Sequence, residues 1–129
     1  MKKLLKISSI LAIILGIGLV VGGVWGICFT YRGIARENIV TPEDASIAST
    51  PVRGPFTLKA QADIIREHML KMSGGKTYAE MARADTNRAT WITATTLTTA
   101  LNLGILSYAL SALTVLFGLF LLWVGFITR

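Results

Sequence analysis

Two long apolar blocks constrain this chain more than any other feature. Residues 7–31 and 97–127 contain no Asp, Glu or Lys. At 1.5 Å of rise per residue, a helix of about 25 residues is roughly 37 Å long, enough to cross a hydrocarbon core of about 30 Å. Backbone groups find no water in lipid, so a spanning segment must be helical or part of a closed barrel. We predict an all-α membrane protein with two transmembrane helices that form a helical hairpin.

Charge is concentrated outside these blocks. Thirteen Lys and Arg residues against seven Asp and Glu give a net charge of +6, and all the acidic residues lie between the blocks. Nucleic-acid-binding surfaces are basic patches without interleaved acidic residues. The pattern therefore favours the lipid bilayer as a partner and excludes nucleic acid.

Basic residues flank both ends of each block. Lys2, Lys3, Lys6 and Arg129 favour cytoplasmic N and C termini by the positive-inside rule. Arg32, Arg36, Arg83 and Arg88 lie on the loop side and favour the opposite orientation. A loop of around 60 residues is at the limit of the rule, so we favour cytoplasmic termini and leave the reverse open.

The chain divides into six segments by composition. A connector containing Pro42, Pro51 and Pro55 is poor material for regular structure, and we expect order there only when something binds it. The predicted segments are a basic tail at 1–6, a first span at 7–31, the connector at 32–56, an amphipathic helix at 57–73, a capped helix at 77–96 that continues into the membrane, and a second span at 97–127.

The segment at 57–73 has apolar residues at helical spacing, which predicts one apolar face. We interpret this face as a surface for docking another protein. Pairs of Asp63 with Arg66 and of Glu67 with Lys71 would support the helix, and Gly74 and Gly75 would end it. The predicted docking face consists of Leu58, Ala62, Ile65, Met69 and Met72.

A second helix is predicted to begin at Thr77. Thr77 and Glu80 have the spacing of a capping box, in which each side chain bonds the other's backbone N–H. No clear helix breaker follows before the second span. We therefore expect one helix from Thr77 through Trp91 into the membrane.

Small residues recur within both spans. Gly18, Gly22 and Gly26 form a double G-x-x-x-G pattern, which lets two membrane helices approach closely. In the second span, Gly104, Ser111 and Gly118 recur every seven residues, which is typical of a left-handed crossing. These two faces could meet each other, another copy or a different subunit.

Polar and aromatic residues suggest how the spans sit in a bilayer. Asn102 is costly against lipid, so we expect it to hydrogen-bond to a neighbouring helix. Amphipathic rings collect where lipid meets water. The predicted interface anchors are Trp25, Tyr31, Trp91 and Trp123.

Catalytic and metal-binding motifs are not found in the sequence. His68 is the only histidine, too few for a facial triad of two His and one carboxylate within one chain. The residues Gly74 to Thr77 imitate the end of a phosphate-binding loop, but Leu70 stands where its first glycine would be. We predict no catalytic, metal or cofactor-binding residue, and no enzyme activity.

Three stretches carry a family resemblance: GPFTLKAQADIIREH at 54–68, GGKTYAEM at 74–81 and RATWITATTL at 88–97. They resemble a family of small two-span bacterial plasma-membrane proteins, some of which are automatically named aromatic ring-opening dioxygenases. The resemblance covers roughly residues 54–104. It implies a bacterial plasma membrane and brings no assigned activity, and a single His leaves non-haem iron short of ligands.

The sequence therefore predicts a structural or accessory subunit that packs against other membrane proteins or against itself. One alternative is a homo-oligomeric channel or transport element, in which Asn102 and nearby threonines form a vestibule. A second alternative is a subunit of a membrane enzyme complex that lends His68 to a site completed by another chain.

Overall fold

The computed structural model describes all 129 residues and is entirely helical. Three α-helices, α1 (Lys2–Arg36), α2 (Pro55–Met72) and α3 (Asn87–Ile127), are joined by two loops, the second of which carries a 3-10 turn at Tyr78–Glu80. There is no β-sheet. Both α1 and α3 are long and apolar enough to cross a membrane.

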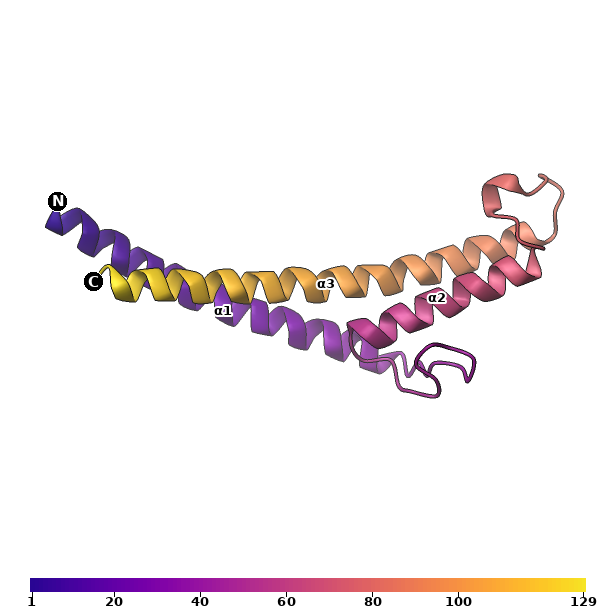
Figure 1. The fold of residues 1–129 in the computed structure, drawn as a ribbon, viewed down its shortest axis with the longest axis horizontal. Coiled ribbons are helices and arrows are strands. Elements are labelled where there is room, and N and C mark those ends of the chain that lie inside the picture. Colours follow the sequence, from indigo (N-terminus) through magenta and orange to yellow (C-terminus); the bar gives the residue numbers. More distant parts are fainter. The chain divides into compact units, whose positions relative to one another are not determined.

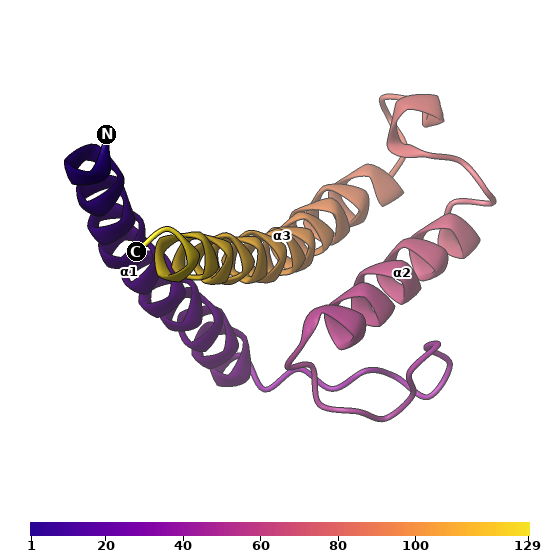
Figure 2. The same ribbon diagram turned by 60° about the vertical axis from the view of Figure 1, so that its left-hand side comes forward.

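The chain forms two compact units. Unit 1 contains residues 1–32 and 107–129, and unit 2 contains residues 33–106. In unit 1, α1 and the C-terminal part of α3 run in opposite directions, and both termini lie at the same end (Figure 1). In unit 2, α2 runs beside the N-terminal half of α3 (Figure 1 and Figure 2).

Helix α2 has clear signals at both ends. Gly54 precedes it, Pro55 occupies its first turn, and the backbone N–H of Gly54 donates to Thr57 Oγ1 at 3.2 Å. At the other end, Gly74 and Gly75 have φ values of 66° and 84°, and the N–H of Gly75 donates to the carbonyl of Leu70 at 2.7 Å. Glycine adopts this left-handed conformation without a Cβ penalty, which ends the helix as predicted from the sequence.

The connector differs from the prediction because α1 continues to Arg36 and the following residues close on themselves. The N–H of Thr41 donates to the carbonyl of Thr50 at 3.0 Å, and the N–H of Thr50 donates to Thr41 Oγ1 at 2.9 Å. Thr41 and Val52 are fully buried. These hydrogen bonds and the burial of Thr41 and Val52 give the segment a defined internal structure.

The prediction of one helix starting at Thr77 is wrong for residues 77–86, because α3 begins only at Asn87. Thr77 and Glu80 do form the reciprocal cap, but only a 3-10 turn follows it, and Met81 has extended backbone. Arg88 donates to the carbonyl of Met81 at 2.9 Å and stacks on the ring of Tyr78. A new cap then starts α3, because Asp85 Oδ1 accepts the N–H of Asn87 at 2.8 Å.

Candidate functional site

The contact between α1 and α3 in unit 1 is made by small residues at seven-residue spacing. The only buried residues of α1 are Ser9, Gly16, Gly23 and Thr30. We call this interface the heptad contact. Its α1 members lie against Gly125, Gly118, Ser111 and Ser107 of α3, respectively.

The glycines of the heptad contact allow backbone to meet backbone. A Cβ added to Gly16 would lie 2.8 Å from the carbonyl oxygen of Gly118, and one added to Gly118 would lie 2.8 Å from that of Gly16. A Cβ on Gly23 would lie 2.7 Å from the carbonyl oxygen of Ser111. Atoms of neighbouring backbones cannot move aside easily, so no larger residue fits at these positions without separating the helices.

Side-chain hydrogen bonds between α1 and α3 lie at both ends of the heptad contact. Ser9 Oγ donates to the carbonyl of Gly125 at 2.6 Å. Thr30 Oγ1 donates to the carbonyl of Gly26 at 2.9 Å and lies 2.6 Å from Ser107 Oγ. Since the Thr30 proton is used on Gly26, Ser107 is the donor in that second pair. Each hydroxyl is therefore satisfied without water.

Of the glycines predicted to pack, Gly18 and Gly22 lie outside the heptad contact. A Cβ at either position would meet nothing within 4 Å. Gly26 does face α3, because its added Cβ would lie 2.5 Å from Ser111 Oγ. The sequence predicts that α1 packs through small residues spaced four apart. In the structure, α1 packs through small residues spaced seven apart, the spacing of Ser111, Gly118 and Gly125 in α3. We call Gly18 and Gly22 the outer glycine face.

The predicted docking face of α2 is covered by the chain itself. Leu58, Ala62 and Met69 are buried, and Met72 is 44% exposed. Met69 belongs to a hydrophobic cluster with Met81, Trp91 and Ala94, and Ile65 packs against it. A Cβ added to Gly104 would lie 3.1 Å from Leu58. The face therefore holds α2 against α3, and the prediction that it docks another protein is wrong for its buried members.

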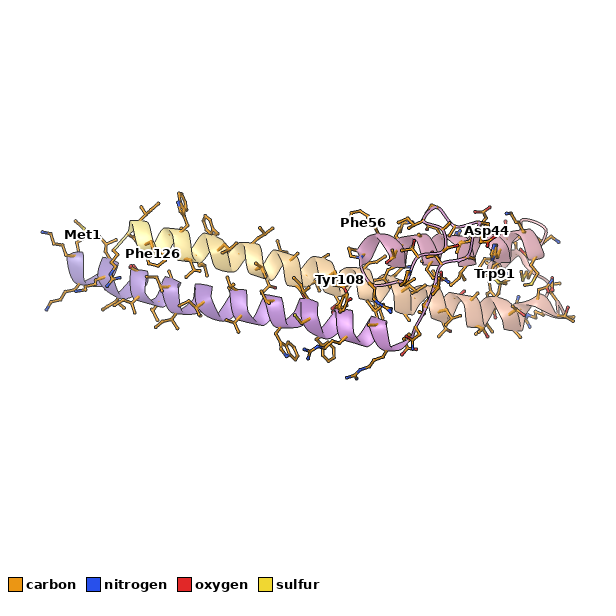
Figure 3. All side chains as sticks on the ribbon, turned by 90° about the horizontal axis from the view of Figure 1, so that it is seen from below. Met1, Asp44, Phe56, Trp91, Tyr108 and Phe126 are labelled. Carbon is orange, nitrogen blue, oxygen red and sulfur yellow. The ribbon has the colours of Figure 1, made fainter.

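Trp91 is a core residue rather than an exposed anchor. It is 6% exposed and belongs to a hydrophobic cluster with Met69 of α2 (Figure 3), whereas Trp25, Tyr31 and Trp123 are all exposed. Phe56, at the start of α2, points away from the helices and is 81% exposed (Figure 3). Sequence reasoning missed the role of Trp91 because a tryptophan beside an apolar block is also typical of the membrane interface.

Asn102 forms no hydrogen bond to another helix of this chain, so a bond to a helix of a second chain stays a prediction. It is exposed and lines a cavity of 220 Å³ between α2 and α3. A second cavity, of 420 Å³, is mainly apolar and is lined by residues of α1, the connector, α2 and α3, including Leu58, Gln61 and Leu101. Both cavities lie within unit 2.

His68 joins α2 to the connector. Its Nε2 lies 2.6 Å from Asp44 Oδ2, and since an ionised carboxylate only accepts, His68 is the donor. This hydrogen bond holds the pKa of Asp44 below its ordinary value. No group of three or more His, Cys, Asp or Glu side chains lies together where it could hold a metal ion.

The other ion pairs of α2 differ in part from the predicted ones. Lys71 pairs with Glu67 at 2.8 Å, as the spacing predicts, and this hydrogen bond raises the pKa of Lys71. Asp63 pairs with Lys59 instead of Arg66. In the loop before α3, hydrogen bonds from Thr77 lower the pKa of Glu80.

Protein-family models, curated proteins and solved structures give no match to this chain. The resemblance to small two-span bacterial proteins therefore stays a prediction. The chain is all-helical, with two long apolar helices compatible with a membrane location.

Proposed function

We propose that this chain is a non-catalytic, two-span protein of a bacterial plasma membrane that serves as an accessory subunit. The observation that carries the proposal is the exposure of the apolar helices. Only 11% of the most apolar stretch of either α1 or α3 is buried. Leaving one large apolar side chain in water costs roughly 1.5–3 kcal/mol, so a lipid environment suits these surfaces far better than water does.

The heptad contact supports a helical hairpin as the membrane form. Lipid is as apolar as leucine, so membrane helices associate through close packing rather than through the hydrophobic effect. Gly16, Gly23 and Gly118 provide that packing. The Ser9 hydroxyl donates a hydrogen bond to α3, and the Thr30 hydroxyl donates one within α1. In this arrangement the basic residues Lys2, Lys3, Lys6 and Arg129 favour cytoplasmic termini.

The outer glycine face supports the accessory role. Gly18 and Gly22 are about one helical turn apart, and a Cβ added to either would meet no other part of the chain within 4 Å. Trp25 and Phe29 follow on the same side of α1 by helical spacing and stack at 5.3 Å. This surface combines two exposed glycines, which would let a second helix approach closely, with a large aromatic pair, and we assign it to another membrane helix.

The test is gentle detergent extraction of a tagged chain from its native membrane, followed by native mass spectrometry. We expect a foreign subunit in fixed ratio, and we expect Gly22→Leu to release it. The matched control is Val24→Phe, which adds bulk roughly 160° around the helix from Gly22. A clean multiple of the 14.0 kDa chain would instead support self-assembly and the transport alternative. Equal retention of the partner by both variants would contradict the role of the outer glycine face.

A further inference from the structure

The cavity of 220 Å³ between α2 and α3 is lined by several polar side chains beside the apolar side chains of Ile65, Met69 and Ala94. Arg66 lines it from α2, and Trp91 lines it from α3. We call it the polar cavity. The remaining polar side chains that line it are Thr95, Thr98, Thr99 and Asn102.

Arg66 supplies a positive charge that the chain leaves unpaired. Its two acidic neighbours on α2 are engaged elsewhere, Asp63 with Lys59 and Glu67 with Lys71. No acidic side chain lines the polar cavity. The charge of Arg66 is therefore available to an anion that enters the cavity, and its planar fork of donors suits the oxygens of a phosphate.

The side chains of α3 add uncommitted hydrogen-bonding groups. Thr93 and Thr96, which lie outside the cavity, donate to the carbonyls of Ala89 and Ile92, as threonines in membrane helices commonly do. The cavity-lining Thr98 and Asn102 form no such bond, and neither do Thr95 and Thr99. Several donors on one helix face thus remain free to bind the oxygens of a ligand.

Trp91 contributes a donor without an acceptor. Its indole Nε1 is covered from solvent and has no hydrogen-bond partner, although the ring lines the polar cavity. Buried polar groups nearly always have partners, and an indole N–H can only donate. The chain therefore leaves this donor, on a residue that lines the polar cavity, without an acceptor.

We propose that the polar cavity binds a phosphate group, with Arg66 as the charged partner and Asn102 and the threonine hydroxyls as neutral donors. Ligand pockets for drug-sized molecules measure roughly 300–1,000 Å³, so this cavity suits a small group rather than a whole lipid. The phosphate comes either from a phospholipid headgroup or from a free phosphate. This site is separate from the outer glycine face and does not depend on an accessory role.

The test uses the full chain in detergent micelles, carrying Trp25→Phe and Trp123→Phe so that Trp91 is the only tryptophan. Its fluorescence is followed while one of three compounds is added: phosphatidylglycerol, the same diacylglycerol with a sugar in place of the phosphate, or inorganic phosphate. We expect a saturable change with at least one phosphate-bearing compound and none with the sugar lipid. Saturation by phosphatidylglycerol alone identifies a lipid headgroup, and saturation by inorganic phosphate identifies a free phosphate.

Matched variants separate a built site from general charge attraction. Arg66→Gln should weaken binding about tenfold, the effect of losing one hydrogen bond to a charged group. Lys76→Gln removes the same charge outside the cavity and should change affinity less than about twofold, since exposed, distant charges are screened. Asn102→Leu, at an exposed position without hydrogen bonds, provides a second variant should Arg66→Gln fail to fold.

Three results would overturn the proposal. The first is the absence of a saturable response to either phosphate-bearing compound. The second is unchanged binding in both Arg66→Gln and Asn102→Leu, and the third is an equal loss in Arg66→Gln and Lys76→Gln. None of these results bears on the accessory subunit, whose test measures a protein partner rather than Trp91 fluorescence.

Discussion

Each of the two units of this chain is stabilised by a different kind of internal contact. Unit 1 has a narrow contact between glycine backbones, serines and a threonine, and leaves most apolar side chains of α1 and α3 exposed. Unit 2 buries large side chains such as Leu58, Met69 and Trp91, and has loop hydrogen bonds and exposed ion pairs. Close packing with an apolar exterior suits lipid, whereas an apolar core with a charged exterior suits water. The difference predicts that substitutions will act on one unit at a time.

The largest effect is expected from Trp91→Ala in unit 2. Removing a buried tryptophan costs about 3–5 kcal/mol, because apolar contacts are lost and a cavity remains. Hydrogen exchange of the α2 amides, followed by mass spectrometry, should show a loss of protection. Trp25→Ala is the matched control, since Trp25 is 67% exposed and its loss should leave α2 protected. Equal loss of protection in the two variants would contradict the assignment of Trp91 to the core.

The next effect is expected from Gly118→Leu in unit 1. Its Cβ would lie 2.8 Å from both the carbonyl oxygen of Gly16 and the backbone nitrogen of Val20, so the helices must separate. Overpacking of this kind costs about 1–3 kcal/mol. Unfolding of the purified chain by SDS should shift to lower detergent fraction. Gly22→Leu adds the same side chain where nothing lies within 4 Å, and an equal shift there would refute the heptad contact.

The register of α1 shows what could be predicted and what could not. Both long helices followed from the apolar blocks, because lipid permits few other structures. Within residues 9–30, however, glycines and hydroxyls occur at spacings of four and of seven, and α1 alone does not distinguish them. Only the match to Gly118 and Ser111, which recur every seven residues in α3, selects the second spacing. Comparing the two helices by period would have identified Gly16 and Gly23.

The apolar face of α2 was predictable, but its partner was not. Leu58, Ala62 and Met69 follow helical spacing, which shows that the face is buried without showing by what. The sequence predicts Trp91 at the membrane interface, but Trp91 belongs to the cluster that includes Met69 and so helps to cover α2. The connector was missed because its order depends on side-chain bonds of Thr41 to backbone nine residues away.

A smaller effect is expected from Ser9→Ala, which removes the hydrogen bond to Gly125 in unit 1. Hydrogen bonds between membrane helices contribute about 1 kcal/mol or less. The same SDS unfolding measurement should show a modest loss of stability. Ser8→Ala is the control, because Ser8 is exposed and bonds only to Leu5 within its own helix. Equal stability of Ser9→Ala and Ser8→Ala would mean that the Ser9 hydroxyl contributes nothing.

The smallest effect is expected from acid acting on unit 2. The hydrogen bond from His68 lowers the pKa of Asp44 in the folded chain, so its contribution to stability is present above the unfolded value of about 3.9. That contribution is lost as the pH falls through the lower, folded pKa. Hydrogen exchange of residues 39–52, corrected for the intrinsic rate, should then accelerate. In Asp44→Asn this acid-dependent change should disappear, and its persistence would show that another group is responsible.

The most direct test of the heptad contact compares disulfide formation in two double-cysteine variants in native membranes, with Cys28 replaced by Ser. A Cβ at Gly26 would lie 3.4 Å from the Cβ of Ser111, close to the spacing of a disulfide. Gly26→Cys with Ser111→Cys should therefore form an intrachain disulfide on mild oxidation, and Gly22→Cys with Ser111→Cys should not. An intrachain disulfide in the second pair, or only intermolecular disulfides in the first, would contradict the heptad contact and the hairpin proposed from it.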